Sequence, residues 1–426
     1  MSNQTLRPVV VVGGLRIPFC RSGSSYADIS NLKMLSTVLN GIVDKYNLQD
    51  EQLGEVNAGA VISHPKDWNL AREAVLSTKL SPRTPALTMQ QACGTSLQAA
   101  AIAAAKIASG QIDSAIAAGS DTVSDVPISF SKKFATRLVK LGKARDIKSK
   151  LALFKGFSPK ELKPNPPSVN EPRTLMSMGQ HCELMAQEWG ITREDQDELA
   201  VTSHLNAAAA YQRGFYDDLL VPCEGVLRDN NMRPDTSVEA LSGLRKVYEK
   251  GDKGTLTAGN STPLTDGSAG LLLASEEWAK ERGLPILAYI TYTQTAAVDF
   301  VGGAGLLMAP TLAVSDMLKR ANLTLQDFDF YEIHEAFAAQ VLCTLKAWED
   351  SEYCKNELGR DTAMGSIDRS KLNVNGSSLA VGHPFAATGA RVTGTLAKIL
   401  DENGGGRGLI SVCTAGGMGV TAILEK

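Results

Sequence analysis

The 426-residue sequence has no long hydrophobic run and no cysteine pairing pattern. No stretch approaches the roughly 18 uninterrupted apolar residues that span a bilayer, and the start, MSNQTLRPVVVVGG, lacks the regions of a signal peptide. The seven cysteines are odd in number and form no CxxC pair, which argues against a disulfide framework and a zinc ribbon. We therefore expect no transmembrane segment, no metal site and a reducing compartment.

The sequence also lacks an excess of either charge and several common catalytic motifs. Its net charge of -3 provides no overall basic field for nucleic acid, so an anionic ligand must be met by a local patch. It contains no P-loop, no H-E-x-x-H, no G-x-S-x-G and no G-x-G-x-x-G at a strand–helix junction. These absences argue against nucleotide hydrolysis, zinc proteolysis and serine esterase chemistry. A hydrophobic fraction of 43% and a charged fraction of 21% are ordinary for a globular protein of two or three domains.

Strand-like and helix-like patterns alternate in two parts of the chain. Residues 9–13 and 55–62 are expected strands, and 31–46 and 70–80 are expected helices, which is typical of a layered α/β domain. The same alternation returns after about Pro285, including an expected strand at 372–376, and the segment that begins at Cys93 resembles the one that begins at Ala387. We interpret this as a weak internal duplication, which would set two equivalent helix starts facing a shared cleft.

A segment of different character separates the two parts. From 126 to 250 the sequence is basic, proline-bearing and polar, and GTLTAGNSTPLTDGSAGLLLAS then returns to glycine-rich turns and an apolar strand. We predict an N-terminal core half from 1–125 and 251–284, an inserted domain from 126–250 and a C-terminal core half from 285–426. The basic run in the insertion is interpreted as a solvated face, a phosphate contact, a partner surface or an interfacial segment.

Four short segments each carry one reactive group in a frame of small residues. They are QQACGTS with Cys93, HEAFAAQ with His334, GHPFAATGAR with His383, and CTAGGMG with Cys413. Each follows an expected strand, and ligands of open α/β sheets bind beyond the carboxyl ends of the strands. We therefore expect the two thiols and two imidazoles to lie at a ligand-binding site.

Each of these groups also has a structural alternative. Cys93 precedes a long alanine-rich helix, where unpaired N–H groups and a neighbouring imidazole would lower its pKa, but free cysteines are commonly core residues. The same holds for Cys413, although the glycines after it would let backbone N–H groups approach a ligand. His383, fixed between glycine and proline, is either a general base or the anchor of a turn. His334 is expected to open a helix, with Glu335 in its first turn in a structural role.

These motifs, together with RIPF, MGQHCE and NSTPLTDGSA, resemble the thiolase superfamily along almost the whole chain. HEAF in place of the commoner NEAF, with GHPFAATGAR, is most similar to the 3-ketoacyl-CoA thiolases that form the β subunits of bacterial and mitochondrial fatty-acid oxidation complexes. The resemblance implies an α/β thiolase fold, five-layered αβαβα, with two similar core halves and an inserted loop domain.

The resemblance also implies a role for each group. Cys93 would accept the acyl group, and His383 would activate the Cys93 thiol. His334 would support the thioester oxygen of the enolate. Cys413 would protonate the departing acetyl-CoA carbanion and later deprotonate coenzyme A. A second oxyanion hole would use the backbone N–H groups of Cys93 and Ala415.

The resemblance further implies substrates, partners and a location. Coenzyme A would be a substrate, with no permanently bound cofactor, and Met178, Thr262 and Pro263 would contact it. A homodimer bound to a hydratase/dehydrogenase α subunit in the bacterial cytoplasm is expected, and peripheral membrane contact stays open. The alternatives are acetoacetyl-CoA thiolysis or condensation, a decarboxylating ketoacyl synthase, which would lack the second thiol, and a non-catalytic acyl-CoA-binding scaffold.

Overall fold

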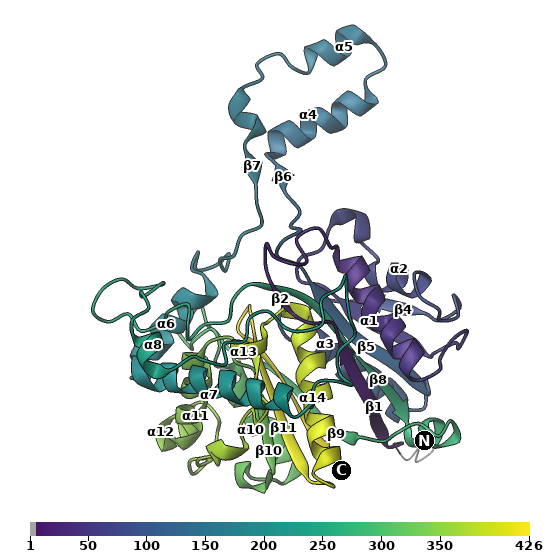
Figure 1. Ribbon diagram of the computed structural model, residues 1–426. Coiled ribbons are helices and arrows are strands. Elements are labelled where there is room, and N and C mark those ends of the chain that lie inside the picture. The colour runs from purple at the N-terminus through teal and green to yellow at the C-terminus, as the bar shows by residue number, and fades with distance from the viewer. Residues whose placement is uncertain (1–5) are drawn as a thin grey trace.

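The computed structural model describes residues 6–426, and its centre is a ten-stranded mixed sheet built from two halves (Figure 1). The N-terminal half has the order β1-β8-β5-β3-β4, with β2 paired to β8, and the C-terminal half has the order β9-β12-β11-β10. Antiparallel pairing of β1 with β9, at Val10 with Tyr289 and Val11 with Ala288, joins the halves. Residues 1–5, part of the start that we expect to lack a signal peptide, lie outside the described residues.

The strands follow the expected apolar segments. They are β1 (Val9–Arg16), β2 (Cys20–Arg21), β3 (Glu55–Gly59), β4 (Ala86–Thr88), β5 (Ser114–Asp121), β8 (Thr265–Ser275), β9 (Ala288–Ala297), β10 (Phe330–Ile333), β11 (Arg407–Thr414) and β12 (Met418–Glu425). Every residue of β1, β5 and β8 is buried. Because helices cover both faces of these strands, they are continuous apolar or small-residue runs rather than alternating patterns.

Helices form three layers around the two half-sheets. The outer layer of the N-terminal half contains α1 (Asn31–Lys45) and α2 (Leu70–Leu76), and that of the C-terminal half contains α10 (Ala309–Ala321), α11 (Ala338–Glu349) and α12 (Ser351–Asn356). Between the half-sheets lie α3 (Thr95–Ala108) and α14 (Thr388–Glu402), which share one apolar core with both. The expected αβαβα layering is therefore confirmed.

The two central helices begin side by side. The backbone N–H of Ala390 donates to Ser96 Oγ at 2.8 Å, and a Cβ on Gly389 would overlap the backbone of Leu97. Only glycine therefore allows α14 to approach α3 this closely. The start of α3 follows Cys93 and the start of α14 follows His383, so this contact sets the two segments against each other.

The segment between β5 and β8 contains the remaining regular elements. A two-stranded ribbon of β6 (Ser129–Phe130) and β7 (Pro164–Asn165) carries α4 (Lys132–Lys143) and α5 (Ile147–Ala152) away from the body (Figure 1). We call residues 129–165 the basic hairpin. After it come α6 (Met178–Glu188), α7 (Arg193–Gln212) and α8 (Val238–Ser242), and α9 (Glu276–Glu281) follows β8.

Two local predictions were wrong. The helix after β10 begins at Ala338 rather than Glu335, because Phe337 is extended (φ -144°) and pairs with Ser261. The segment 372–376 is not a strand, since Asn373 has φ 47°, and the short helix α13 (Ser378–Val381) follows it. In the described part of the chain, no helix has the length and apolarity required to cross a bilayer.

Candidate active site

Cys93 lies in a sharp turn between β4 and α3. The preceding residue, Ala92, has φ 46°, a left-handed conformation that costs a non-glycine residue about 1 kcal/mol or more. A Cβ on Gly94 would lie 2.7 Å from Val420 Cγ2, so this turn is pressed against β12 of the other half. Among the cysteines of residues 6–426, Cys93 is the one that is not fully buried. The strained turn thus presents one reachable thiol at the interface of the two halves.

His383 contacts this thiol directly. Its Nε2 lies 3.2 Å from Cys93 Sγ, and its Nδ1 lies 2.5 Å from Thr388 Oγ1. Its backbone N–H donates to Thr265 Oγ1 at 2.7 Å, and Gly382 before it has φ 106°. With Nδ1–H donating to Thr388, Nε2 is free to accept the thiol proton, as a general base must.

Burial keeps this pair uncharged in the protein alone. It raises the pKa of the Cys93 thiol to about 12, against weaker lowering by hydrogen bonds from the backbone N–H groups of Ala415 and Cys93. Burial, and secondarily the positive charge of Arg391, lowers the pKa of His383 to about 3. The expected lowering of the Cys93 pKa at the helix start is therefore wrong, because desolvation outweighs the helix N-terminus. The resting state is a neutral thiol beside a neutral imidazole.

His334 lies beside His383, with ring centroids 4.1 Å apart. It follows β10 directly, and its backbone N–H donates to Ser411 O at 2.8 Å in continuation of the parallel ladder with β11. Its Nδ1 lies 2.8 Å from Ser378 Oγ, whereas no group of the described chain bonds its buried Nε2. Burial, and then the neighbouring His383, lowers the pKa of His334 well below its ordinary value.

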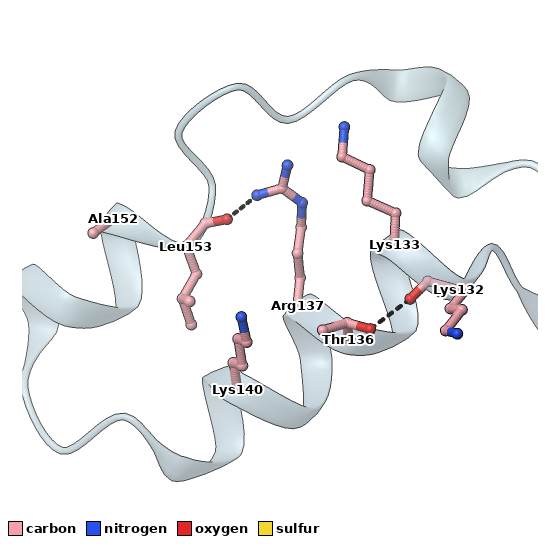
Figure 2. Close-up of a pocket in the computed structure, with 7 residues that line it drawn as sticks. All are labelled: Lys132, Lys133, Thr136, Arg137, Lys140, Ala152 and Leu153. Carbon is pink, nitrogen blue, oxygen red and sulfur yellow. Dashed lines mark hydrogen bonds between the residues drawn. The ribbon is translucent and has the colours of Figure 1, made fainter.

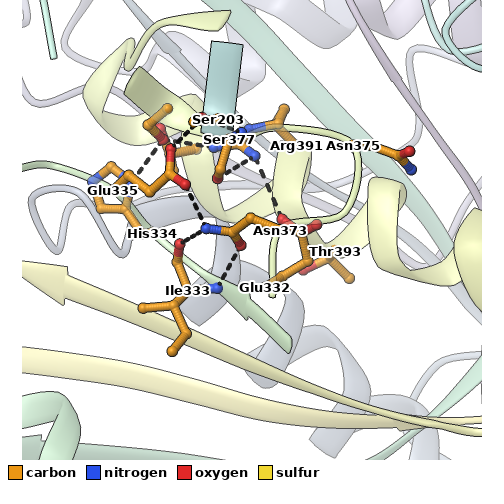
Figure 3. A network of polar contacts seen from close by, with 12 residues as sticks. Ser203, Glu332, Ile333, His334, Glu335, Asn373, Asn375, Ser377, Arg391 and Thr393 are labelled. Carbon is orange, nitrogen blue, oxygen red and sulfur yellow. Dashed lines mark hydrogen bonds and ion pairs between the residues drawn. The ribbon is translucent and has the colours of Figure 1, made fainter. Parts of the chain in front are cut away.

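Glu335 is not a first-turn helix acid but a buried acceptor that supports the HEAF segment (Figure 3). Its Oε2 accepts from Ser203 Oγ at 2.7 Å and from the backbone N–H of Leu379 at 3.2 Å. Its Oε1 accepts from Asn373 Nδ2 at 2.7 Å. These bonds connect the residue after His334 to α7, to the 373 turn and to α13.

Cys413 lies near the end of β11 and is buried. Burial, and then the nearby Cys93, raises its pKa well above the usual value, so it too rests as a thiol. In the glycine-rich turn that follows, the N–H of Ala415 is directed at the Cys93 sulfur, and the N–H of Gly416 donates to Glu171 Oε1 at 2.7 Å. The two backbone donors predicted for an oxyanion hole, on Cys93 and Ala415, thus both face the Cys93 sulfur.

The three expected coenzyme-binding residues border this region. Thr262 Oγ1 donates to Ala336 O at 3.0 Å, within the HEAF segment, and Thr262 and Pro263 are both partly exposed. Met178 begins α6 and packs against the cluster that contains Cys413. Among residues 6–426, no group of three His, Cys, Asp or Glu residues is placed to hold a metal ion.

A cavity of about 600 Å³ lies elsewhere, in the basic hairpin (Figure 2). Its lining includes Lys132, Lys133, Arg137 and Lys140. Arg137 is held by Glu161, whose Oε2 accepts from Arg137 Nε at 2.8 Å. Apart from Glu161, no residue of the basic hairpin is buried. The sequence motifs, not cavity size, therefore locate the reactive groups.

Three polar residues of the site were missed by the sequence analysis. Asp121, at the end of β5, accepts from the N–H of Ala386 at 2.7 Å and so anchors the segment after His383. Burial raises its pKa to about 7. Arg391 and Ser378 are also buried, next to His334. An arginine in the apolar first turns of α14 was the available signal, since a buried charge requires partners.

Comparison with known proteins agrees with this arrangement. Residues 9–277 match the thiolase N-terminal domain and residues 284–426 the thiolase C-terminal domain. The chain is 40% identical over 423 residues to a 3-ketoacyl-CoA thiolase of Yersinia pestis (strain Pestoides F), covering 98% of this chain and 96% of that one.

Solved structures show the same similarity. A Bacillus anthracis acetyl-CoA acetyltransferase superposes with a TM-score of 0.83 at 30% identity, over 99% of this chain and 100% of that one. Human mitochondrial 3-ketoacyl-CoA thiolase in complex with CoA superposes with a TM-score of 0.81 at 28% identity, over 100% of both chains. Family models, relatives and fold agree over nearly the whole sequence, and the chain belongs to the thiolase family of acyltransferases.

Proposed function

We propose that the protein is a 3-ketoacyl-CoA thiolase that cleaves 3-ketoacyl-CoA with coenzyme A into acetyl-CoA and a shortened acyl-CoA in fatty-acid β-oxidation. The observation that carries the proposal is the contact of Cys93 Sγ with His383 Nε2 at 3.2 Å, beside a second buried thiol and an unpaired imidazole nitrogen. The 40% identity to a 3-ketoacyl-CoA thiolase adds support.

In the first half-reaction, His383 Nε2 takes the Cys93 proton as the sulfur attacks the 3-keto carbon. The bond between C2 and C3 then breaks, leaving an acyl group on Cys93 and an enolate of acetyl-CoA, which the Cys413 thiol protonates. His334 Nε2 stabilises the enolate oxygen together with His383. Because both imidazoles rest in neutral form, the charge on His383 develops only during attack, and it remains until His383 returns the proton to Cys93 in the second half-reaction.

In the second half-reaction, the Cys413 thiolate takes the proton of coenzyme A, whose sulfur attacks the acyl-Cys93 thioester. The thioester oxygen is held by the N–H groups of Cys93 and Ala415, both directed at this sulfur. Cys93 leaves with a proton from His383, which returns the site to its starting state. Coenzyme A is thus a substrate, and we place its pantetheine chain against Met178, Thr262 and Pro263.

The test is coenzyme A-dependent thiolysis of 3-ketoacyl-CoAs from short to long chain. We expect activity on long chains and no acyl-enzyme in Cys93→Ala. Cys413→Ala should still be acylated by an acyl-CoA but should not cleave 3-ketoacyl-CoA. Normal turnover of Cys93→Ala would refute the proposal. Activity confined to acetoacetyl-CoA would instead favour an acetyl-CoA C-acetyltransferase, the second candidate, which the similarity to the B. anthracis enzyme favours.

The proposed assembly is a cytoplasmic homodimer bound to a hydratase/dehydrogenase subunit through the basic hairpin. The basic hairpin has nine lysines and two arginines against one aspartate and one glutamate, a net charge of +9 in a chain of net charge -3. Seven of its large apolar side chains are also exposed: Phe130, Leu138, Val139, Ile147, Leu151, Phe154 and Leu162. A basic and apolar surface of this kind favours an acidic partner with apolar pockets.

Charge reversal tests this surface. Lys140→Glu with Lys143→Glu should abolish copurification with the partner, whereas Lys250→Glu with Lys253→Glu, outside the basic hairpin, should not. Unchanged copurification of the first variant would refute the assignment. Loss of binding to anionic vesicles, with the partner still bound, would assign the basic hairpin to a membrane surface instead.

We also propose a division of this enzyme into three parts. The N-terminal core half comprises residues 1–125 and 251–284, the inserted domain comprises residues 126–250, and the C-terminal core half comprises residues 285–426.

A further inference from the structure

A buried arginine reaches the His334 imidazole through a single hydroxyl group. Arg391 lies in the second turn of α14, and its Nη2 donates to Ser378 Oγ at 2.6 Å. The same oxygen lies 2.8 Å from His334 Nδ1. All three residues are at most 4% exposed. The line Arg391–Ser378–His334 is therefore shielded from water.

The hydrogen count along this line decides which imidazole nitrogen carries the proton. A guanidinium group has only donors, so Ser378 Oγ accepts from Arg391. The hydroxyl proton then has His334 Nδ1 as its acceptor, since no other acceptor bonds Ser378 Oγ in the described residues. If Nδ1 were protonated, two buried donors would face the same oxygen and the hydroxyl proton would stay unpaired, at a cost of about 1–3 kcal/mol.

The other nitrogen of the ring agrees with this assignment. His334 Nε2 is buried, and no group of residues 6–426 bonds it. Its ring stands 4.1 Å from that of His383, whose Nε2 contacts Cys93. A buried N–H without a hydrogen-bond acceptor is costly unless a ligand atom accepts from it. The proton on Nε2 is thus directed at the place where the substrate reacts.

We propose that Ser378 and Arg391 are positioning residues that hold His334 in its Nε2–H tautomer, so that it donates to the thioester oxygen of the departing acetyl-CoA enolate. The inference rests on the proposed function, in which His334 stabilises that oxygen. In the other tautomer, Nε2 would present a lone pair to a developing negative charge and repel it.

Arg391 is itself fixed from several sides. Its Nη1 donates to Ser377 Oγ at 3.0 Å and lies 3.7 Å from Glu332 Oε2. Its positive charge is one of the causes that lower the His334 pKa, after burial and His383. The arginine therefore both orients the hydroxyl and disfavours a second proton on the ring.

The tautomer is directly measurable in the full-length protein. With only five histidines, ¹⁵N-histidine labelling gives few two-bond ¹⁵N–¹H correlations, and His334→Gln assigns those of His334. We expect a wild-type Nε2–H pattern for His334. A wild-type Nδ1–H pattern would overturn the proposal without any positioning variant.

Two variants then separate positioning from structure. Ser378→Ala removes the hydroxyl between Arg391 and His334, whereas Ser377→Ala removes a hydroxyl that bonds Arg391 but not His334. We expect Ser378→Ala to give a mixed tautomer and a 10- to 100-fold lower kcat for thiolysis, and Ser377→Ala to change neither by more than about twofold. Acylation of Cys93 by acyl-CoA, which forms no enolate, should keep its rate in both.

An Nε2–H pattern with unchanged kcat in Ser378→Ala would refute the positioning role. An equal loss of kcat in Ser377→Ala would also refute it. If Ser378→Ala does not fold, Ser378→Cys, which keeps a weak donor of similar size, replaces it. We expect Ser378→Cys to retain the Nε2–H tautomer of His334 at reduced kcat. Full kcat with an Nδ1–H pattern in this variant would refute the proposal. Failure of the proposed function is seen separately, as normal turnover in Cys93→Ala. Full thiolysis by His334→Gln would remove the role of His334 itself.

Discussion

Replacing Glu335 by glutamine should destabilise the protein markedly, although the two side chains have the same shape. Both carboxylate oxygens only accept: Oε1 from Asn373 Nδ2, and Oε2 from Ser203 Oγ and Leu379 N. A glutamine has one accepting oxygen, so its amide nitrogen must face a donor on one side. Asn373 cannot invert its amide to compensate, because its Oδ1 accepts from Ile333 N and its Nδ2 also donates to Ile333 O.

The cost follows from these contacts. One buried donor left without an acceptor costs about 1–3 kcal/mol, and the remaining bonds lose their charged acceptor, for a total of about 2–4 kcal/mol. Glu335→Gln should therefore lower the free energy of unfolding in urea by this amount. It should also reduce kcat, because the same bonds hold the segment that carries His334.

The neighbouring Glu332 provides the control. It is equally buried and its Oε2 lies 3.7 Å from Arg391 Nη1, but neither carboxyl oxygen has a hydrogen bond in the described structure. Burial, against weaker lowering by Arg391, raises its pKa to about 8. At pH 7 a glutamine would therefore replace a neutral acid of the same shape, and Glu332→Gln should cost less than about 1 kcal/mol. Equal destabilisation by the two substitutions would refute the hydrogen-bond argument.

Two further predictions concern His383 and the segment after it. The pKa of His383 is about 3 in the folded protein and about 6.5 unfolded, so the unfolded chain binds more protons between these values and stability is lost as pH falls. From pH 7 to pH 5 His383 should lower the free energy of unfolding by about 2 kcal/mol, measured by urea unfolding of the wild type and of His383→Gln. If the unfolding free energies of the two proteins change in parallel with pH, the ring is not buried in neutral form. Gly119→Ala would force a Cβ into the Ala386 carbonyl and should displace the His383 segment, lowering kcat together with thermal stability, whereas Gly142→Ala, in open space on α4, should change neither.

The elements and reactive residues were predictable because their signals are local. The apolar run of β1, the alanine-rich α3 and the small-residue frames around Cys93 and His383 each specify structure within about a dozen residues. The helix after β10 was placed three residues too early for the same reason. The alanines of HEAFAA favour helix, but pairing of Phe337 with Ser261, from a distant segment, keeps it extended.

The electrostatics were not predictable, because they depend on residues that are distant in sequence. Helix position alone predicts a lowered Cys93 pKa, yet the turn is covered by Thr414 and Val420 from the other half, and the resulting desolvation reverses the direction. The contact of Arg391 with Ser378 likewise requires α13 and α14 to be placed in space first. The sequence therefore identifies the reactive groups but not their resting protonation.

That resting state constrains how the site can work. Two thiols and two imidazoles, all buried or nearly so, are each held in the uncharged form by desolvation. A preformed thiolate–imidazolium pair would carry this desolvation cost throughout the cycle. In the proposed mechanism, a neutral pair separates charge only when an acyl carbonyl is present to receive the electrons, with the N–H groups of Cys93 and Ala415 already directed at the reacting sulfur. The same burial that holds Cys93 as a neutral thiol thus makes its activation, in the proposed mechanism, depend on bound substrate.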